Sequence, residues 1–368
     1  MVRQPPRKRV CPGYDGTTSF GTNLGYELSF SGQDIPETTA SGRIDVPLKS
    51  PNSAEGLLAS LFSSIQKLAD FNASGFISDS RREAIQERAG AKNTILRVYY
   101  PPDYYFADSS ERDKVGPTPD INSVLELVQA SIDCEEEAMS EHGWNCEVHY
   151  PLLSMAVHGA SKIPKQLLHV IPCTTARIIQ NYRSPDRQVK MVDFSIAIKP
   201  LHSKLEVDKN AAAEIDIRRK TLPSGSINHT AYEPLLQYPI SVTIETKKGG
   251  SDEKSSIIQA VTWQRAQWRQ LMRMVHTRDF RTRGNVFLPI FYVLGSQWYF
   301  AATALEDGEV VLYRGLECGS LGSTNTPYGT YKIIYGIQLV LQYVQNHYWP
   351  WYKEAALGMP VEVEVGGY

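Results

Sequence analysis

The chain has 368 residues, of which 42% are hydrophobic, and a formal net charge of −2. This is enough apolar material for one large domain, or for a domain with appendages. No apolar run approaches the ~20 residues of a membrane span, and none follows the basic residues 1–10, so we expect neither a membrane span nor a secretory signal. A nearly neutral protein needs a local basic surface to bind nucleic acid.

The cysteines are scattered, odd in number and without C-x-x-C spacing. Such cysteines are typical of reduced thiols in an intracellular protein, and they argue against a zinc site. The basic cluster Arg7, Lys8 and Arg9 fits either a solvated tail or a nuclear-import signal, so a nuclear location stays open.

The N-terminal part of the chain is predicted to be a tail followed by helices. Residues 1–52 are rich in Gly, Pro, Ser and Thr and show no sustained period, which predicts a flexible tail. Apolar spacing predicts two helices within residues 54–89, and Ser78 with Asp79 is the expected cap of the second. Residues 99–119 are rich in Pro, Tyr and Asp and are expected to form a loop. We therefore assign residues 53–120 to N-terminal helices and a loop.

Residues 121–357 carry the patterns of the main domain, and residues 358–368 are assigned to a C-terminal tail. Helices are predicted around residues 125–132, 143–157, 255–276 and 327–348, and strands near 168–180, 189–199, 239–247, 286–294, 297–305 and 309–314. The last helix is expected to end before Pro350. The polar residues 204–226 are expected to be an insertion or a mobile loop. This order predicts an α/β fold with a mixed β-sheet flanked by helices.

The most informative strand is the run of residues 240–244, which ends at Glu245, Thr246 and Lys247. Alternation in a strand directs its isoleucines and valine to one face, and Glu245 and Lys247 to the other. A carboxylate beside an amine at the end of a buried strand is suited to hold a divalent metal and to place a cation next to a reacting phosphate.

Asp193 occupies an equivalent position upstream. Residues 192–198 alternate in the same way, with Asp193 on the small and polar face. If the two strands are neighbours, Asp193, Glu245 and Lys247 meet on one face. Two carboxylates and a lysine around Mg²⁺ form a site for phosphodiester hydrolysis. The spacing alone also fits a surface acid near a surface ion pair.

Asp193 followed by Glu245-x-Lys247 resembles the PD-(D/E)XK nuclease superfamily, which has the restriction-endonuclease-like fold, although Val192 stands in place of its proline. With further segments, the chain resembles the fungal PD-(D/E)XK nuclease-like domain proteins over roughly residues 56–357. The resemblance implies that Asp193 and Glu245 hold Mg²⁺ or Mn²⁺, that the Thr246 carbonyl is a further ligand, and that Lys247 positions the attacking water. The further segments are residues 144–153, 226–235 and 348–351.

A fourth acid usually comes, in this superfamily, from the helix before the first core strand. Glu141 is one candidate, and its spacing to Asn145 and His149 puts all three on one helical face if the helix continues through Gly143. His149 also fits a histidine that only packs the helix. The other candidates for this fourth acid are Glu135, Glu136, Glu137 and Glu147.

The helix after Lys247 carries arginines at helical spacing. Arg265, Arg269 and Arg273 form a stripe that, with Lys248, lines either a phosphate track or a solvated helix face.

Three other polar residues are candidates for the cleft. Gln259, on the same helix as the arginines, is a candidate polar neighbour of the site. Asn228 and His229 precede the strand and fit either turn chemistry or ligand-binding groups.

These patterns predict a metal-dependent nuclease with DNA as its expected partner. The alternative is a fold kept as a binding module, or one turned to a small-molecule reaction of secondary metabolism. Val192 and the nearly neutral charge favour this alternative, whereas the intact Asp193, Glu245 and Lys247 favour the nuclease. The sequence carries no signal for an oligomeric state.

Overall fold

The structure, a computed structural model, describes residues 46–70, 72–91, 98–159, 166–184, 191–275, 286–315 and 319–360. All of them fall within the unit Glu37–Tyr368. The helices are α1 (Gly56–Ala69), α2 (Arg82–Gly90), α3 (Ser109–Val115), α4 (Ile121–Glu136), α5 (Glu141–Trp144), α6 (Tyr150–His158), α7 (Glu206–Arg219), α8 (Glu253–Met274), α10 (Pro327–Tyr343) and α11 (Trp349–Trp351). The strands are β1 (Leu48–Lys49), β2 (Ile77–Ser78), β3 (Phe106–Ala107), β4 (Leu168–Pro172), β5 (Phe194–Ile198), β6 (Ile240–Lys247), β7 (Phe287–Leu294), β8 (Gln297–Glu306), β9 (Glu309–Arg314) and β10 (Gly322–Ser323).

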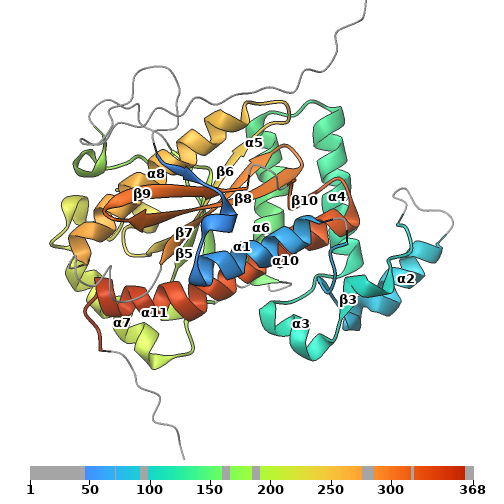
Figure 1. Ribbon diagram of the computed structural model, residues 1–368, viewed down its shortest axis with the longest axis horizontal. Helices are drawn as coiled ribbons and strands as arrows, with labels where there is room; N and C mark the ends of the chain where they lie inside the picture. Colours follow the sequence, from blue (N-terminus) through green and yellow to red (C-terminus); the bar gives the residue numbers. More distant parts are fainter. Residues whose placement is uncertain are drawn as a thin grey trace, which may run out of the picture. The chain divides into compact units, whose positions relative to one another are not determined.

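A mixed sheet of 8 strands runs through the middle of this unit (Figure 1). Its order is β1-β9-β8-β7-β6-β5-β4, and β10 pairs with β8. β6 and β7 are parallel, whereas β6 and β5 are antiparallel, so the C-terminal end of β6 lies beside the start of β5. The predicted α/β fold with a mixed sheet flanked by helices is confirmed.

Helices cover both faces of the sheet. On one side, α8 packs its residues Ile257 and Val261 against Ile290 and Tyr292 of β7. On the other side, α1, α4, α6 and α10 form one large apolar cluster with β5 and β6. Every residue of β5 is therefore buried, including Ser195 on the face expected to be polar. On that face Ala197 belongs to the apolar cluster that contains Trp263 of α8.

One strand residue departs from the predicted alternation. Ile240 joins the apolar cluster that contains Trp263 of α8, whereas Val242 and Ile244 join the cluster on the opposite side. The pairing register of β5 and β6 shifts between Ile196 and Ala197, close to this point. Such a register irregularity re-aims side chains locally, so strict alternation holds only from Val242 onward.

The stretch 204–226, expected to be a mobile loop, instead contains helix α7. Acidic residues in its first turn and arginines in its last turn complement the helix dipole. Its Asp208 is buried and accepts hydrogen bonds from Trp349 Nε1 at 2.6 Å and from Lys353 Nζ at 2.7 Å. Few of its residues are apolar, and Ala211 and Ile215 are the buried ones, which explains why periodicity gave no helical signal.

The N-terminal region is more ordered than expected. Residues 99–119, expected to be a loop, contain helix α3, whose Asp108 cap accepts from the backbone N–H of Ser110. Leu48 and Lys49, assigned above to the flexible tail, pair with β9 as strand β1. The first 45 residues, which include Arg7, Lys8 and Arg9, lie outside the described residues.

Two helices contain π-helical turns just before a proline. Residues 145–149 join α5 to α6 ahead of Pro151, and residues 344–348 join α10 to α11 ahead of Pro350. A proline lacks an N–H and clashes with the carbonyl four residues back, and the wider π turn relieves both problems. The sequence predicts that the last helix ends before Pro350. The helix instead continues through Pro350 to Ala356.

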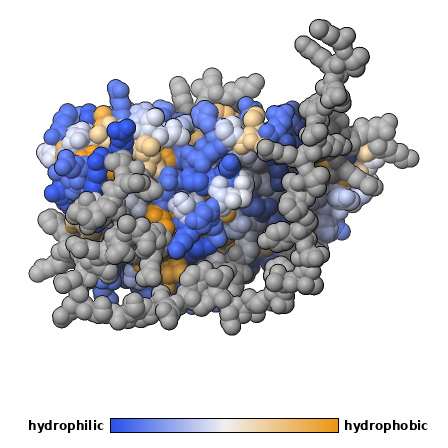
Figure 2. Space-filling view, turned by 90° about the horizontal axis from the view of Figure 1, so that it is seen from above, coloured by the Kyte–Doolittle hydropathy of each residue, from blue (hydrophilic) through white to orange (hydrophobic). Residues whose placement is uncertain are grey.

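The described surface is largely polar on one face. Hydrophilic residues predominate there, with apolar residues scattered among them (Figure 2). Among the described helices, none is long and apolar enough to cross a membrane.

Candidate active site

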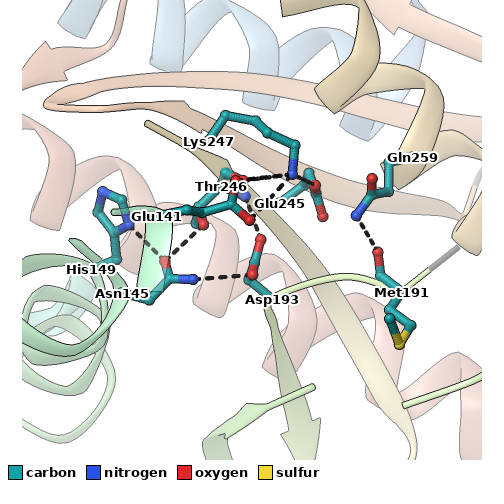
Figure 3. Close-up of polar contacts among 9 residues, drawn as sticks. All are labelled: Glu141, Asn145, His149, Met191, Asp193, Glu245, Thr246, Lys247 and Gln259. Carbon is teal, nitrogen blue, oxygen red and sulfur yellow. Dashed lines mark hydrogen bonds and ion pairs between the residues drawn. The ribbon is translucent and has the colours of Figure 1, made fainter. Parts of the chain in front are cut away.

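Asp193 and Glu245 lie side by side at one end of the sheet. Phe194 of β5 pairs with Ile244 of β6 in antiparallel register, so Asp193 and Glu245, one step further, face each other. Both are buried, with Asp193 6% exposed and Glu245 0% exposed. Lys247, at the end of β6, completes the group, as Figure 3 shows. The geometry expected for neighbouring strands is therefore present.

Two hydrogen bonds hold the carboxylate of Asp193. Asn145 Nδ2 donates to Oδ1 over 3.0 Å, and the backbone N–H of Thr246 donates to Oδ2 over 2.9 Å. The Thr246 hydroxyl in turn donates to Asn145 Oδ1 over 2.7 Å. Each carboxylate oxygen has two lone pairs, so both bonds leave room for a further ligand.

The Lys247 amine lies within a group of oxygens. Its Nζ donates to Glu245 Oε1 at 2.6 Å and to the Thr246 carbonyl at 3.0 Å, and lies 3.4 Å from Glu141 Oε2. Burial lowers the pKa of Lys247, but the carboxylates of Glu245, Glu141 and Asp193 together outweigh burial, and the pKa is raised overall. Burial, followed by the Asp193 carboxylate, raises the pKa of Glu245 well above its usual range. The cationic lysine therefore offsets part of the charge of these acids.

The oxygens around Lys247 fit a hard divalent cation. Glu245 Oε2 is buried and has no hydrogen-bond partner in the structure, which leaves an acceptor open to a ligand. Asp193, Glu245 and the Thr246 carbonyl offer oxygen donors, which Mg²⁺ prefers. Among the described residues, no three His, Cys, Asp or Glu side chains are grouped so that they enclose a metal.

Glu141 reaches the site from the start of α5. Its side chain is 39% exposed and faces Lys247. Burial raises the pKa of Glu141, against the opposing effect of the Lys247 charge. The helix continues through Gly143 without a break, so Glu141, Asn145 and His149 share one face, as their spacing required.

His149 is a buried histidine that contacts Asn145 of the site. Its ring stacks on Trp144 with centroids 5.6 Å apart and meets Trp298 edge-on at 5.9 Å. Nδ1 is 2.9 Å from Asn145 Oδ1, and Nε2 is 2.9 Å from the Gly295 carbonyl. Complete burial lowers the pKa of His149 to about 4. The ring is therefore neutral at pH 7 and donates to only one of these two oxygens.

The structure does not bring Asn228 and His229 to the carboxylates. They lie at the N-terminal end of β6, whereas Glu245 lies near its C-terminal end. Asn228 accepts from the backbone N–H of Ile240 at 3.0 Å and so fixes the entry to the strand. The ring of His229 is fully buried against Trp263, with ring centroids 4.3 Å apart. Asn228 therefore stabilises a turn, which is the first of the two roles that the sequence predicts for it.

Gln259 supports the site from α8. Its Nε2 donates to the Met191 carbonyl over 2.6 Å, which anchors the segment that leads into Asp193 (Figure 3). Lys248 follows Lys247 and is exposed.

The arginine stripe of α8 makes contacts with the chain near Tyr182. Arg269 donates to the Tyr182 carbonyl at 3.0 Å and to Ser184 Oγ at 2.9 Å. The guanidinium of Arg273 lies 5.5 Å from the Tyr182 ring centroid and is exposed, and Arg265 is partly buried. Arg269 therefore has a packing role, whereas Arg273 is open to solvent.

Sequence patterns missed part of the site. The spacing groups Asn145 with Glu141 and His149, but it does not indicate that the Asn145 amide donates to Asp193. It gives no sign of the contacts of the Thr246 hydroxyl and N–H or of the Gly295 carbonyl either. A polar residue six positions before a proline within a helical pattern, as Asn145 is before Pro151, is one signal for a π turn that re-aims a side chain.

The sequence of the chain matches the model of a known protein family. The model of the PD-(D/E)XK nuclease superfamily matches residues 97–349, which is more than half of the chain. The chain therefore belongs to the PD-(D/E)XK nuclease superfamily, and its mixed sheet agrees with the restriction-endonuclease-like fold. A search of curated proteins and a search of solved structures found no match.

Proposed function

We propose that this protein is a nuclease that hydrolyses phosphodiester bonds of DNA with the help of Mg²⁺ or Mn²⁺. The main support is the pairing of Asp193 with Glu245 beside Lys247, in a chain of a nuclease superfamily. The unpartnered Oε2 of Glu245 adds to it, because a buried carboxylate oxygen without a donor is costly unless a ligand completes it.

In this proposal Asp193, Glu245 and the Thr246 carbonyl hold the ion. The bound ion lowers the pKa of a water ligand and neutralises phosphate charge. Asn145 and the Thr246 N–H keep the Asp193 carboxylate turned toward Glu245. The Lys247 ammonium, already 2.6 Å from Glu245, lies where it orients the attacking water or stabilises charge that develops on the phosphate.

A DNA substrate requires basic groups near the site. Lys248 is exposed directly after Lys247, whereas Arg273 is exposed at the far end of α8, where Gln270 contacts Ile227. These cations are candidates for backbone phosphate contacts, which dominate non-specific affinity for DNA.

A second candidate is a fold that has lost hydrolysis and kept a binding role or taken up a small-molecule reaction. The observation that favours it is Val192 in place of the superfamily's proline. The nearly neutral net charge of −2 points the same way. A protein of this kind would bind a ligand at this site without breaking phosphodiester bonds.

A cleavage assay separates the two candidates. Supercoiled plasmid and single-stranded DNA are incubated with the protein and Mg²⁺, Mn²⁺ or EDTA. We expect nicking with either metal and none with EDTA, and we expect Lys247→Ala to reduce the rate at least ~100-fold, the scale of removing one preorganised charge.

The matched control is Lys220→Ala. Lys220 is an exposed lysine directly after α7 and forms an ion pair with Asp216 of that helix. We expect this control to cleave like the unaltered protein. Equal nicking by Lys247→Ala and the unaltered protein, or nicking that persists in EDTA, contradicts the proposal. The absence of nicking by folded, unaltered protein favours the second candidate.

A further inference from the structure

Asn145 occupies the centre of the polar contacts at the candidate site (Figure 3). It is 5% exposed, and its amide contacts three side chains that come from different elements. Its Nδ2 donates to Asp193, while its Oδ1 accepts from the Thr246 hydroxyl and lies 2.9 Å from His149 Nδ1. An amide that faces a carboxylate on one side must present its N–H₂ there, so Asp193 fixes which way this amide points.

The helix delivers Asn145 through its π turn. Residues 145–149 form this turn, and Asn145 and His149 both point from it toward the sheet. Single π turns within α-helices are common at functional sites. Pro151 favours the turn because its ring is incompatible with a regular helix. The local sequence therefore specifies the unusual geometry that brings Asn145 to Asp193.

A chain of contacts links this amide back to the catalytic strand. His149 Nε2 lies 2.9 Å from the Gly295 carbonyl, and the Gly295 N–H donates to the Lys247 carbonyl over 2.7 Å. Gly295 adopts a φ of +57°, and a Cβ there would lie 3.1 Å from the backbone of Gly249. The turn after β7 therefore requires glycine, and it connects His149 to the end of β6.

We propose that Asn145 is a positioning residue that holds the Asp193 carboxylate in its metal-binding orientation. This inference rests on the proposed metal-dependent function. Asn145 touches a ligand of the ion rather than the ion or the substrate. Partners of this kind set the orientation of first ligands, and their loss typically weakens metal binding by 10–100-fold.

The test compares Mn²⁺ binding by the full chain, followed by calorimetric titration, with cleavage measured across Mn²⁺ concentrations. The variants are Asn145→Ala, and Asn145→Ser in case the first does not fold. The matched control is Asn228→Ala, another buried asparagine, which donates to the carbonyls of Leu235 and Tyr238 at the far end of β6. Circular dichroism establishes that each variant is folded.

We expect Asn145→Ala to weaken Mn²⁺ binding at least ~10-fold and to raise the half-saturating Mn²⁺ concentration for cleavage by a similar factor. Saturating Mn²⁺ should restore much of kcat, which a general loss of folded protein would not permit. Asn228→Ala should lower stability and leave Mn²⁺ affinity unchanged.

Unchanged Mn²⁺ affinity in folded Asn145→Ala and Asn145→Ser overturns the positioning role and leaves the proposed nuclease function intact. Equal weakening in Asn145→Ala and Asn228→Ala also overturns it, because the effect is then a general structural one. If the unaltered protein neither binds Mn²⁺ nor cleaves DNA, the proposed function and this inference both fail.

Discussion

Glu245 is a carboxylate in the interior of the sheet, 0% exposed and beside a second carboxylate, Asp193. Its Oε1 is bonded to Lys247, and its Oε2 has no hydrogen-bond partner in the structure. Burial and the Asp193 charge both oppose ionisation, which is why the pKa of Glu245 is raised. A divalent cation would reverse this balance, since it stabilises both charged carboxylates at once.

Glu245→Gln should abolish Mg²⁺ and Mn²⁺ binding without unfolding the chain. The amide removes an anionic ligand from a hard-cation site. It also removes the repulsion between two nearby acids, so the free energy of unfolding should stay the same or rise. Calorimetric titration with Mn²⁺ and urea unfolding measure these two effects. The exposed Glu309→Gln, at the start of β9, is the control and should change neither. An unfolded Glu245→Gln would mark Glu245 as a structural residue.

Burial of His229 predicts how the free energy of unfolding depends on pH. Its ring is buried against Trp263, and burial lowers its pKa from 6.5 to about 3. The folded protein therefore binds fewer protons than the unfolded chain below pH 6.5. Stability should be fully present above about pH 6.5 and should fall as the pH drops toward 3, by about 1.4 kcal/mol per pH unit for this one group.

His229→Phe keeps an aromatic ring against Trp263 and removes the titrating group. We expect the slope of unfolding free energy against pH, measured between pH 6 and 4, to fall by about 1.4 kcal/mol per unit. The exposed His347→Gln is the control and should leave the slope as it is. An identical slope in His229→Phe and the unaltered protein would contradict burial of a neutral His229.

At the scale of elements, the two strands of the site were predictable for a clear physical reason. The alternation in residues 242–247 gives both the strand and the side on which Glu245 and Lys247 lie. Asp193, directly before β5, follows the same logic. The contact of Asn145 with Asp193 was not predictable, because it depends on a π turn and on the packing of that helix against the sheet. Spacing along one element cannot specify such a contact.

Helix α8 carries the third prediction. Replacement of Arg265, Arg269 and Arg273 by Gln should weaken DNA binding equally at every sequence if the stripe follows a phosphate backbone. The slope of log affinity against log salt should then fall by up to about 0.9 for each lost duplex contact. Binding titrations at several salt concentrations measure this slope.

The triple variant also removes the hydrogen bonds that Arg269 donates to Tyr182 and Ser184. Arg273→Gln leaves those bonds in place and tests the exposed end of the stripe alone. A solvated helix face predicts an unchanged slope for both variants and little change in stability. That result would favour a repurposed fold over a nuclease.

At the scale of the whole molecule, the site lies at one end of a sheet covered on both faces. Helix α8 holds one side through Gln259 and the segment before Asp193, and α5 with its π turn holds the other through Asn145. Glu245 and Lys247 lie on the buried strand β6, and Asp193 directly precedes β5, so the sheet fixes all three side chains.

The global arrangement was only partly predictable. The order of helices and strands specified an α/β fold with a mixed sheet, because apolar periodicity follows burial. Helix α7 was missed because its sequence is mostly polar and only two of its apolar residues, Ala211 and Ile215, are buried. Strand β1 was missed because its pairing with β9 joins positions far apart in sequence, as Leu48 and Leu312 show.

In the proposed function, Asp193 and Glu245 hold one divalent ion beside Lys247. Anomalous diffraction from crystals soaked in Mn²⁺ tests it most directly, since the scattering locates the metal without reference to activity. We predict a single Mn²⁺ peak between the two carboxylates, in direct contact with an oxygen of Asp193 and an oxygen of Glu245. A peak elsewhere in the protein, or none at millimolar Mn²⁺, would contradict the account.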